Sequence, residues 1–238
     1  MSTVRARRLA LPALCALAAL LFGALGVWQI ERLTWKRDLI ARVNARLAAP
    51  PAPLPPRSFW DVLAAKDTEY RRVRVAGRFR HEAETLVDAL TERGPGFWVL
   101  TPLETPQGLV LINRGFVPPG RRLPSARREG QVAGSALVTG LMRVTEPGGR
   151  FLRPNEPPRD RWYSRDVAAI AAARGLAGAA PFFIDADAAP NPGGWPVGGM
   201  TVIRFRNTHL VYALTWFALM SLSLAGLVLA VRSPQQRD

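Results

Sequence analysis

Two long apolar runs, one near each end of the chain, constrain what this sequence can fold into more than any other feature. Residues 9–30 and 210–231 contain no Asp, Glu, Lys or Arg. Each run is about 22 residues long, and a helix of that length reaches ~33 Å, which is enough to cross the hydrocarbon core of a bilayer. We therefore predict two transmembrane helices, one for each run.

Arginines flank both runs on the sides that face the chain ends. They are Arg5, Arg7 and Arg8 before the first run and Arg232 and Arg237 after the second. Because basic residues close to a span tend to stay in the cytoplasm, both termini, residues 1–8 and 232–238, are expected there. Residues 31–209 then form a domain on the other side of the membrane.

The first run has an alternative interpretation as a cleaved signal peptide. Its basic start fits that class of segment, and Ala24 with Gly26 provides a small-x-small cleavage site. However, the run is longer than a usual signal core and continues past that site to Ile30. An uncleaved helix is therefore favoured.

Small residues recur at a spacing of four in both runs. Ala19 and Gly23 show it in the first run, and Ser221 and Ala225 show it in the second. Small residues at this spacing let two helices pack closely in lipid. A high alanine content alone produces the same pattern, so both explanations stay open.

The chain is strongly basic, with 32 Lys and Arg against 18 Asp and Glu and a net charge of +14. Such a balance suits nucleic acid, acidic lipid or an acidic protein. Nucleic acid is not expected outside the cytoplasm, so the composition leaves membrane lipid and an acidic protein as candidate partners. Cys15, the only cysteine, excludes an intrachain disulfide, and we interpret it as an apolar filler.

The sequence between the runs changes from helical to strand periodicity. Residues 33–47 keep apolar positions at helical spacing, and the prolines of residues 49–56 end that helix with an extended spacer. From residue 70 to residue 80, apolar and basic residues alternate, with one slip near Arg72 that we interpret as a bulge. The other predicted elements are a helix at residues 166–174, capped by Asp166 and ended by Gly175, and strands at residues 85–89, 97–101, 109–113, 135–144, 182–185 and 200–205.

These elements predict an α+β fold. Two transmembrane helices, N- and C-terminal, flank a mostly antiparallel β domain, because short turns join many of the strands. We expect the domain to be a curved sheet or an open barrel with one or two helices.

No catalytic motif is present in this chain. It lacks the nucleophile elbow, the P-loop, the zinc-protease motif and the dinucleotide fingerprint, so we expect that it is not an enzyme. Asp185 and Asp187 form a carboxylate pair at a predicted strand end, which we interpret as solvated loop acids. His81 lies between Arg80 and Glu82 and is expected to be exposed and structural.

His209, directly before the second run, is the strongest candidate for a binding residue. Ionisable residues at a membrane boundary are costly and often functional. On a helix, Tyr212 and Trp216 share one face with it, and Arg204 and Arg206 precede it. Imidazole ligates haem iron, aromatic rings suit the macrocycle, and arginines suit the two propionates. The commoner role of such residues is an interfacial belt of aromatic and basic anchors, and both interpretations stay open at this point.

The end of the first run has a similar composition. Trp28 and Gln29 end the run, and Trp35 with Lys36 follows shortly after. We expect these residues to face the same region as His209. An aromatic belt explains the tryptophans equally well.

Several segments, in the same order along nearly the whole chain, together resemble the surfeit-locus (Surf-one) family of cytochrome c oxidase assembly factors. They are GVWQIERLTWK (26–36), VAGRF (75–79), GPG (94–96) with TPL (101–103), VLINRGFVP (110–118), WY (162–163) with Asp166, and NTHLVYALTW (207–216). Phe116 departs from the family, which often has Trp there. The joint pattern is specific, although no single segment is.

The resemblance implies a two-helix protein of the bacterial inner membrane, or of the mitochondrial inner membrane in eukaryotes, with its central domain in the periplasm. It implies a role in maturing the catalytic subunit of cytochrome c oxidase, at the insertion of haem a. The haem a synthesis machinery is a further candidate partner.

The resemblance also implies roles for single residues. Bacterial members are associated with haem a through the histidine that matches His209, which favours a haem contact and makes His209 a ligand of the haem iron. Gly115 is expected to meet a backbone requirement, and Arg114 to contact a partner. A scaffold that stabilises the nascent oxidase subunit without binding haem is the alternative.

Overall fold

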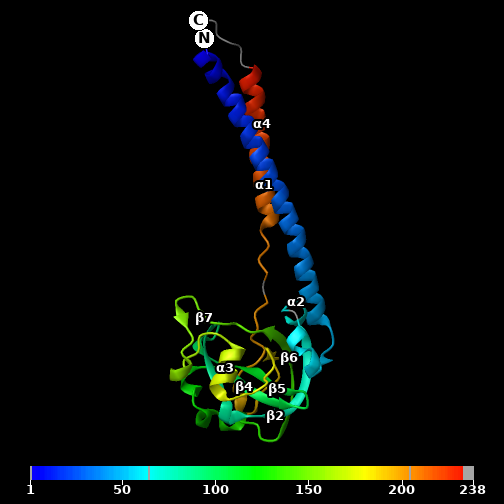
Figure 1. The fold of residues 1–238 in the computed structure, drawn as a ribbon, viewed down its shortest axis with the longest axis vertical. Helices are drawn as coiled ribbons and strands as arrows, with labels where there is room; N and C mark the ends of the chain where they lie inside the picture. Colours follow the sequence, from blue (N-terminus) through cyan, green and yellow to red (C-terminus); the bar gives the residue numbers. More distant parts are fainter. Residues whose placement is uncertain (1, 64, 204, 233–238) are drawn as a thin grey trace. The chain divides into compact units, whose positions relative to one another are not determined.

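The computed structural model describes residues 2–63, 65–203 and 205–232, without the side chains of residues 2–8, 65 and 66. The chain forms two compact units (Figure 1). Residues 1–43 with 204–238 are called the helical unit, and residues 44–203 are called the β domain.

The helical unit is built from two apolar helices, α1 (Ser2–Ala48) and α4 (His209–Arg232). Both are long and apolar enough to cross a membrane, with mean hydropathies of 2.3 and 2.1. Only 11% and 0% of their apolar windows are buried, whereas the core helix of a soluble protein is mostly buried. Outward-facing apolar side chains such as Leu20, 73% exposed, indicate membrane association. The helix predicted at residues 33–47 is confirmed as a continuation of α1.

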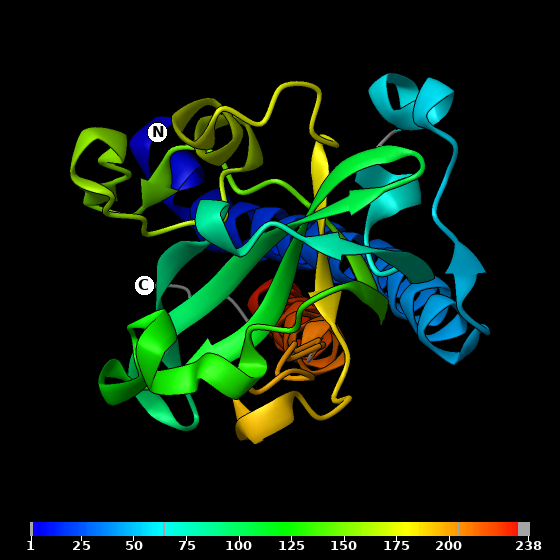
Figure 2. The ribbon, with the colours of Figure 1, turned by 90° about the horizontal axis from the view of Figure 1, so that it is seen from below.

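The β domain is built on a sheet that closes on itself. Neighbouring strands follow the order β1-β2-β6-β9-β5-β4-β3, and a further pairing of β2 with β4 closes a barrel (Figure 2). The strand bounds are β1 Ala52–Pro53, β2 Arg72–Phe79, β3 Thr85–Thr91, β4 Gly94–Thr105, β5 Gly108–Val117, β6 Ser135–Val144 and β9 Phe182–Ala186. All neighbours are antiparallel except β1 with β2 and β5 with β9. The mostly antiparallel α+β prediction is confirmed, and the barrel is closed rather than open.

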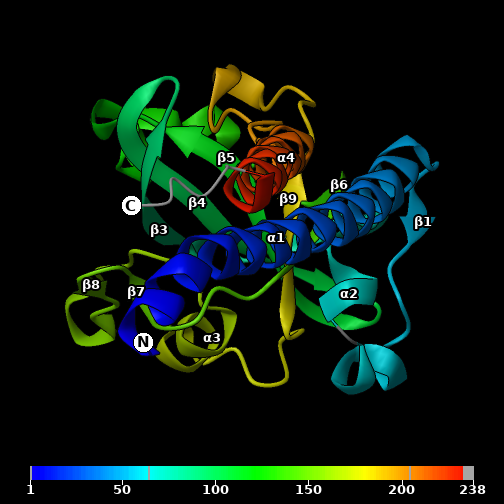
Figure 3. The ribbon, with the colours of Figure 1, turned by 90° about the horizontal axis from the view of Figure 1, so that it is seen from above.

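Shorter elements complete the domain. A separate two-stranded sheet, β7 (Gly149–Arg150) with β8 (Arg153–Pro154), lies at the periphery of the β domain (Figure 3). The helices are α2 (Ala65–Thr68) and α3 (Val167–Arg174). The 3-10 helices are Arg57–Val62, His81–Ala83, Pro119–Arg121, Pro124–Gly130, Pro157–Arg159 and Pro192–Gly194.

Helix α3 begins and ends at the residues that the sequence predicts. The Asp166 carboxylate accepts a hydrogen bond from the Ala169 N–H at 3.1 Å. Gly175 follows the helix with a φ of +64°, the left-handed conformation that glycine adopts without strain. The predicted N-cap and C-terminal glycine are both confirmed.

Two clusters of buried side chains lie on the two faces of the barrel strands. Successive residues of β5 alternate between them: Val110 and Ile112 belong to the first cluster and Leu111 to the second. Every barrel strand contributes to the first cluster, which therefore fills the barrel, together with Trp60. Helix α3 contributes Val167 to the second cluster. Burial on both faces explains why β5 is an almost continuous apolar run.

The remaining strand predictions are mixed. The strands predicted from residues 85 to 144 and at residues 182–185 correspond to β3, β4, β5, β6 and β9. The strand predicted at residues 200–205 is wrong, because its described residues have irregular backbone. The predicted bulge is confirmed just before β2. Tyr70, with a φ of +60°, and Arg71 both pair with Met142 of β6: the Tyr70 N–H donates to the Met142 carbonyl at 2.9 Å, and the Met142 N–H donates to the Arg71 carbonyl at 2.8 Å.

Candidate functional site

Small residues of α1 form a seam against α4 in the helical unit. A Cβ added to Gly26 would lie 2.6 Å from the Phe217 ring, and one added to Gly23 would lie 3.0 Å from a methionine sulfur. Glycine at these positions lets the two helices approach closely, which favours the packing explanation for the first run. Ser221 and Ala225 of α4 are exposed, so the packing explanation does not hold for the second run.

A hydrogen bond joins the two helices at the first residue of α4. His209 Nδ1 lies 2.7 Å from Oε1 of Gln29, a residue that is 8% exposed. An amide oxygen only accepts hydrogen bonds, so in the neutral ring Nδ1 carries the proton and Nε2 keeps a lone pair. Nε2 has no hydrogen-bond partner among the described residues. Metal-ligating histidines are oriented through the second ring nitrogen in this same way.

The other predicted site residues differ in how far they are covered: one aromatic ring packs against α1, and the other described residues are exposed. Trp216 stacks on Phe22 of α1 with ring centroids 5.6 Å apart, so its ring belongs to the seam. Tyr212 is 53% exposed, and Arg206 is exposed. Arg204 lies outside the described residues. The seam therefore includes the tryptophan and leaves the tyrosine on the helix surface.

Of these residues, His209 offers the clearest feature for binding a haem, and it does so through one atom, Nε2. The lone pair on His209 Nε2 is the donor that haem iron takes from imidazole. Exposed apolar side chains next to it, Leu210 and Val211, are compatible with a macrocycle. The Trp216 ring is already covered by its stack on α1. The haem contact stays a prediction, with His209 as its one ligand.

Asp185 of β9 is the centre of a buried polar cluster in the β domain. This residue is 4% exposed, and its carboxylate accepts side-chain hydrogen bonds at 2.7 to 3.1 Å from Asn113, Arg143, Arg165 and Thr201. The prediction of a solvated loop acid is wrong for Asp185, because β9 lies between β5 and β6 within the sheet. Asp187 is partly exposed and accepts a hydrogen bond from the Ala189 N–H, in line with that prediction.

Opposite charges compensate one another around Asp185. Burial lowers the pKa of Arg143, but the carboxylates of Asp185 and Glu69 outweigh burial and hold that pKa above its ordinary value. Burial likewise raises the pKa of Glu146, but its ion pair with Arg165 outweighs burial, so that pKa lies below its ordinary value. The cluster therefore links β6, β9 and the segment before α3 through paired charges.

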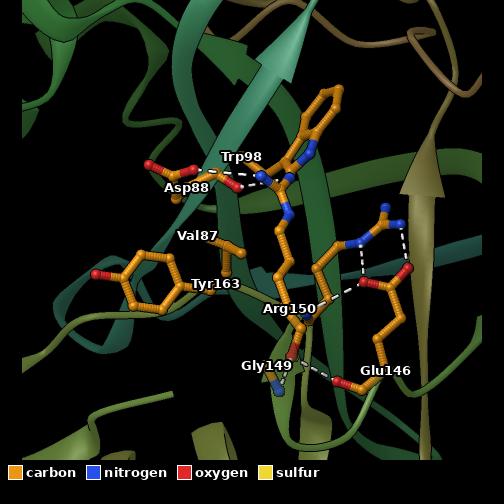
Figure 4. A pocket seen from close by; sticks show the side chains of 9 residues that line it. Val87, Asp88, Trp98, Glu146, Gly149, Arg150 and Tyr163 are labelled. Carbon is orange, nitrogen blue, oxygen red and sulfur yellow. Dashed lines mark hydrogen bonds and ion pairs between the residues drawn. The ribbon is translucent and has the colours of Figure 1, made fainter. Parts of the chain in front are cut away.

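A polar pocket of about 310 Å³ lies beside this cluster (Figure 4). It is lined by Val87, Asp88, Trp98, Glu146, Gly149, Arg150, Tyr163, Ser164 and Arg165. The Ser164 hydroxyl accepts a hydrogen bond from the Gly149 N–H at 3.0 Å and donates one to the Glu146 carbonyl at 2.6 Å. The hydroxyl is thus held by backbone groups. The described residues contain no group of three or more His, Cys, Asp or Glu that could hold a metal ion.

The segment at residues 110–118 forms β5 and is enclosed by the domain. Gly115 has a φ of +122°, and a Cβ there would collide with the Val197 carbonyl, which confirms the expected backbone requirement. Arg114 is 2% exposed, with its guanidinium 4.7 Å from the Phe79 ring centroid. Burial lowers the pKa of Arg114 to about 10. An enclosed guanidinium offers no surface to a partner, so that expectation is contradicted.

Two further single-residue predictions concern His81 and Cys15. His81 is half-buried rather than exposed, with Nε2 3.0 Å from the Val132 carbonyl, and this contact ties it to the domain as a structural residue. Cys15 is partly buried, and a Cβ added to Gly226 of α4 would lie 3.5 Å from its sulfur. The cysteine therefore fills space in the seam, as predicted.

The chain is similar over most of its length to proteins of one family. The model of the SURF1 family matches residues 16–221. Surfeit locus protein 1 of Mus musculus is 40% identical over 223 residues, which cover 87% of this chain and 70% of the mouse protein. The Homo sapiens protein of the same name is 39% identical, covering 83% of this chain and 69% of its own. A SURF1-like protein of Monosiga brevicollis is 37% identical, covering 95% and 89%.

Proposed function

Since this chain belongs to the SURF1 family, we propose that it is a membrane-associated assembly factor for haem–copper cytochrome c oxidase. Its proposed task is to assist the insertion of haem a into the catalytic subunit, without catalysing a reaction of its own. We place it in the bacterial inner membrane, and the arginines that flank the two spans support cytoplasmic termini with the β domain in the periplasm.

The haem part of this proposal depends on the hydrogen bond between His209 Nδ1 and Gln29 Oε1. This bond holds the imidazole at the start of α4 and leaves Nε2 free among the described residues. A haem supplies an iron that takes such a nitrogen and two propionates that pair with cations. Tyr212, which is exposed, is assigned to the haem macrocycle, and Arg206, also exposed, to one propionate. Arg204 is assigned to the other propionate on the basis of the sequence alone.

A pure scaffold is the second candidate, and one observation favours it. His209 and Trp216 both contact α1, one through a hydrogen bond and the other through a ring stack. These contacts hold the two helices together without any cargo. In this alternative the protein binds the nascent oxidase subunit and never carries haem.

Purification of the full chain from cells that make haem a tests the ligand. We expect a haem absorbance spectrum on the wild type and its loss in His209→Ala, because the iron loses its nitrogen ligand. Tyr212→Phe is the matched control on the same helix, and it should keep the spectrum because the ring remains.

The outcomes separate the two candidates. An unchanged spectrum in His209→Ala contradicts the ligand assignment. A chain that never carries pigment, in cells where oxidase haem content still depends on it, supports the scaffold instead.

A further inference from the structure

The tip of the β7–β8 hairpin presents two bare apolar side chains. Phe151 is 91% exposed and Leu152 is 85% exposed, more than any other large apolar residue in the described part of the chain. They are the two residues that connect β7 to β8. Leu152 also has a φ of +61°, a conformation that suits glycine or asparagine better than leucine. Neither burial nor turn geometry explains why apolar residues occupy this tip.

The base of the same hairpin is firmly attached to the β domain. The Gly148 N–H donates to the Asp166 carboxylate at 3.0 Å, and the Gly149 N–H donates to the Ser164 hydroxyl at 3.0 Å. Arg150 reaches across to Asp88 of β3, with 3.4 Å between Nη1 and Oδ1 (Figure 4). The hairpin therefore holds its apolar tip outward on a fixed base.

Arg150 and Arg153 flank the tip directly in the chain, and Arg161 lies in the following segment, where it pairs with Glu156 through its backbone. Arg153 and Arg161 are exposed and have no ion pair among the described residues. Nearby acids are already paired, Glu156 with Arg159 at 3.0 Å and Asp160 with a helix arginine at 2.6 Å. An apolar tip with unpaired cations beside it suits a surface that is apolar inside and acidic outside.

We propose that the β7–β8 hairpin is a membrane contact: Phe151 and Leu152 enter the interface of the bilayer, and Arg153 and Arg161 pair with acidic phospholipid headgroups. Buried apolar area and attraction to anionic lipid are the two terms that bind proteins to membrane interfaces. The inference rests on the anchoring of the chain by α1 and α4. Anchoring makes the second contact intramolecular, so a weak affinity is sufficient.

A bilayer fits this tip better than a protein partner does. A protein interface of useful strength needs apolar anchors inside a wider rim that excludes water. Here two apolar residues project alone, and the neighbouring side chains are charged and exposed. A fluid interface accepts such a projection without a matching pocket.

An environment-sensitive fluorophore on the tip tests the proposal in the full chain. Cys15 is the only cysteine, so a Cys15→Ser background with Phe151→Cys gives a single labelling site. The labelled protein is placed in nanodiscs of phosphatidylcholine alone or with phosphatidylglycerol. We expect blue-shifted, brighter emission that spin-labelled lipid quenches, and a larger shift with phosphatidylglycerol.

A second labelling site and a charge variant complete the test. The second site is Leu123→Cys, at a residue 65% exposed elsewhere on the domain. A fluorophore there should show the emission of a water-exposed site in both kinds of nanodisc. Arg153→Glu should abolish the additional shift with phosphatidylglycerol. Emission at residue 151 that matches residue 123, or that changes only when an oxidase subunit is added, overturns the proposal. These readouts need no haem, so they are independent of the spectrum of His209→Ala.

Discussion

Asp185 of the β domain and His209 of the helical unit differ in how completely their polar atoms are satisfied. The Asp185 carboxylate accepts hydrogen bonds from an asparagine, two arginines and a threonine. Among the described residues, His209 has one hydrogen-bond partner, Gln29, on one ring nitrogen. A buried carboxylate is costly unless its lone pairs are satisfied, so its cluster stabilises the fold. An imidazole with an open nitrogen keeps capacity for a ligand. A fully satisfied polar group therefore marks a structural role, and a polar group with an open lone pair marks a candidate binding role.

The largest effect is expected from breaking the fully satisfied cluster. Asp185→Leu leaves Arg143 and Arg165 buried beside an apolar side chain, and breaking a buried pair typically costs about 3–5 kcal/mol. We expect the midpoint of urea unfolding of the β domain, followed by tryptophan fluorescence, to fall accordingly. Asp187→Ala, two residues along the chain, should cost about 0.5 kcal/mol. Equal losses in the two variants would show that the cluster contributes nothing specific.

A smaller and more local effect is expected from replacing Gln29, the hydrogen-bond partner of His209, because it should weaken haem binding without affecting the β domain. Gln29→Leu removes the acceptor for His209 Nδ1, and losing such a partner weakens a metal ligand by about 10-fold or more. On the proposed function, haem titration should show this weaker binding, while urea unfolding of the β domain stays unchanged. Trp28→Phe, at an exposed neighbour, is the control. Wild-type haem affinity in Gln29→Leu contradicts the orienting role.

The smallest effect concerns pH and the partly exposed Glu146–Arg165 ion pair of the cluster. The pKa of Glu146 is lower in the folded chain than its ordinary value of 4.5, mainly because Arg165 outweighs the opposing effect of burial. Glu146 thus contributes stability above about pH 4.5 that is lost as pH falls through its lowered pKa. We expect Glu146→Gln to flatten the fall in melting temperature between pH 5 and pH 3.

Solvent screening limits the size of that effect, because the Glu146 side chain is 38% exposed. Glu104→Gln, at an exposed residue of β4, is the matched control. If both variants keep the wild-type slope, the Glu146–Arg165 pair is not a source of the acid sensitivity.

Local patterns predicted the elements of the β domain but not their closure. The strand at residues 135–144 and the cap of α3 follow from alternation and from Asp166, which are properties of neighbouring residues. The pairing of β2 with β4 joins Arg78 to Glu104, and no local pattern reports it. Asp185 was misassigned for the same reason: its partners Asn113 and Arg165 lie 72 and 20 residues away.

The candidate site was more predictable than the domain, because membrane spans leave few ways for two helices to lie together. Gln29 and His209 are 180 residues apart, yet Gln29 lies near the end of the first run and His209 directly precedes the second, on the same side of the predicted membrane. The stack of Trp216 on Phe22 needed the structure, since sequence alone does not fix helix rotation. Phe151 and Leu152 were missed, although an apolar pair between Gly149 and Pro154 is unusual for a turn.

Barrel closure has a consequence for how this protein meets a client. The outer edge of β3 is bridged by the segment that precedes α3, with the Asp88 N–H donating to the Trp162 carbonyl at 2.8 Å. In the described chain an incoming polypeptide therefore finds little exposed strand to extend by backbone pairing. Contacts with a client are then expected to come from individual side chains on loops. Such contacts can break one after another. On the proposed function, such an attachment is easily reversed, which suits an assembly factor that leaves the oxidase subunit after haem insertion.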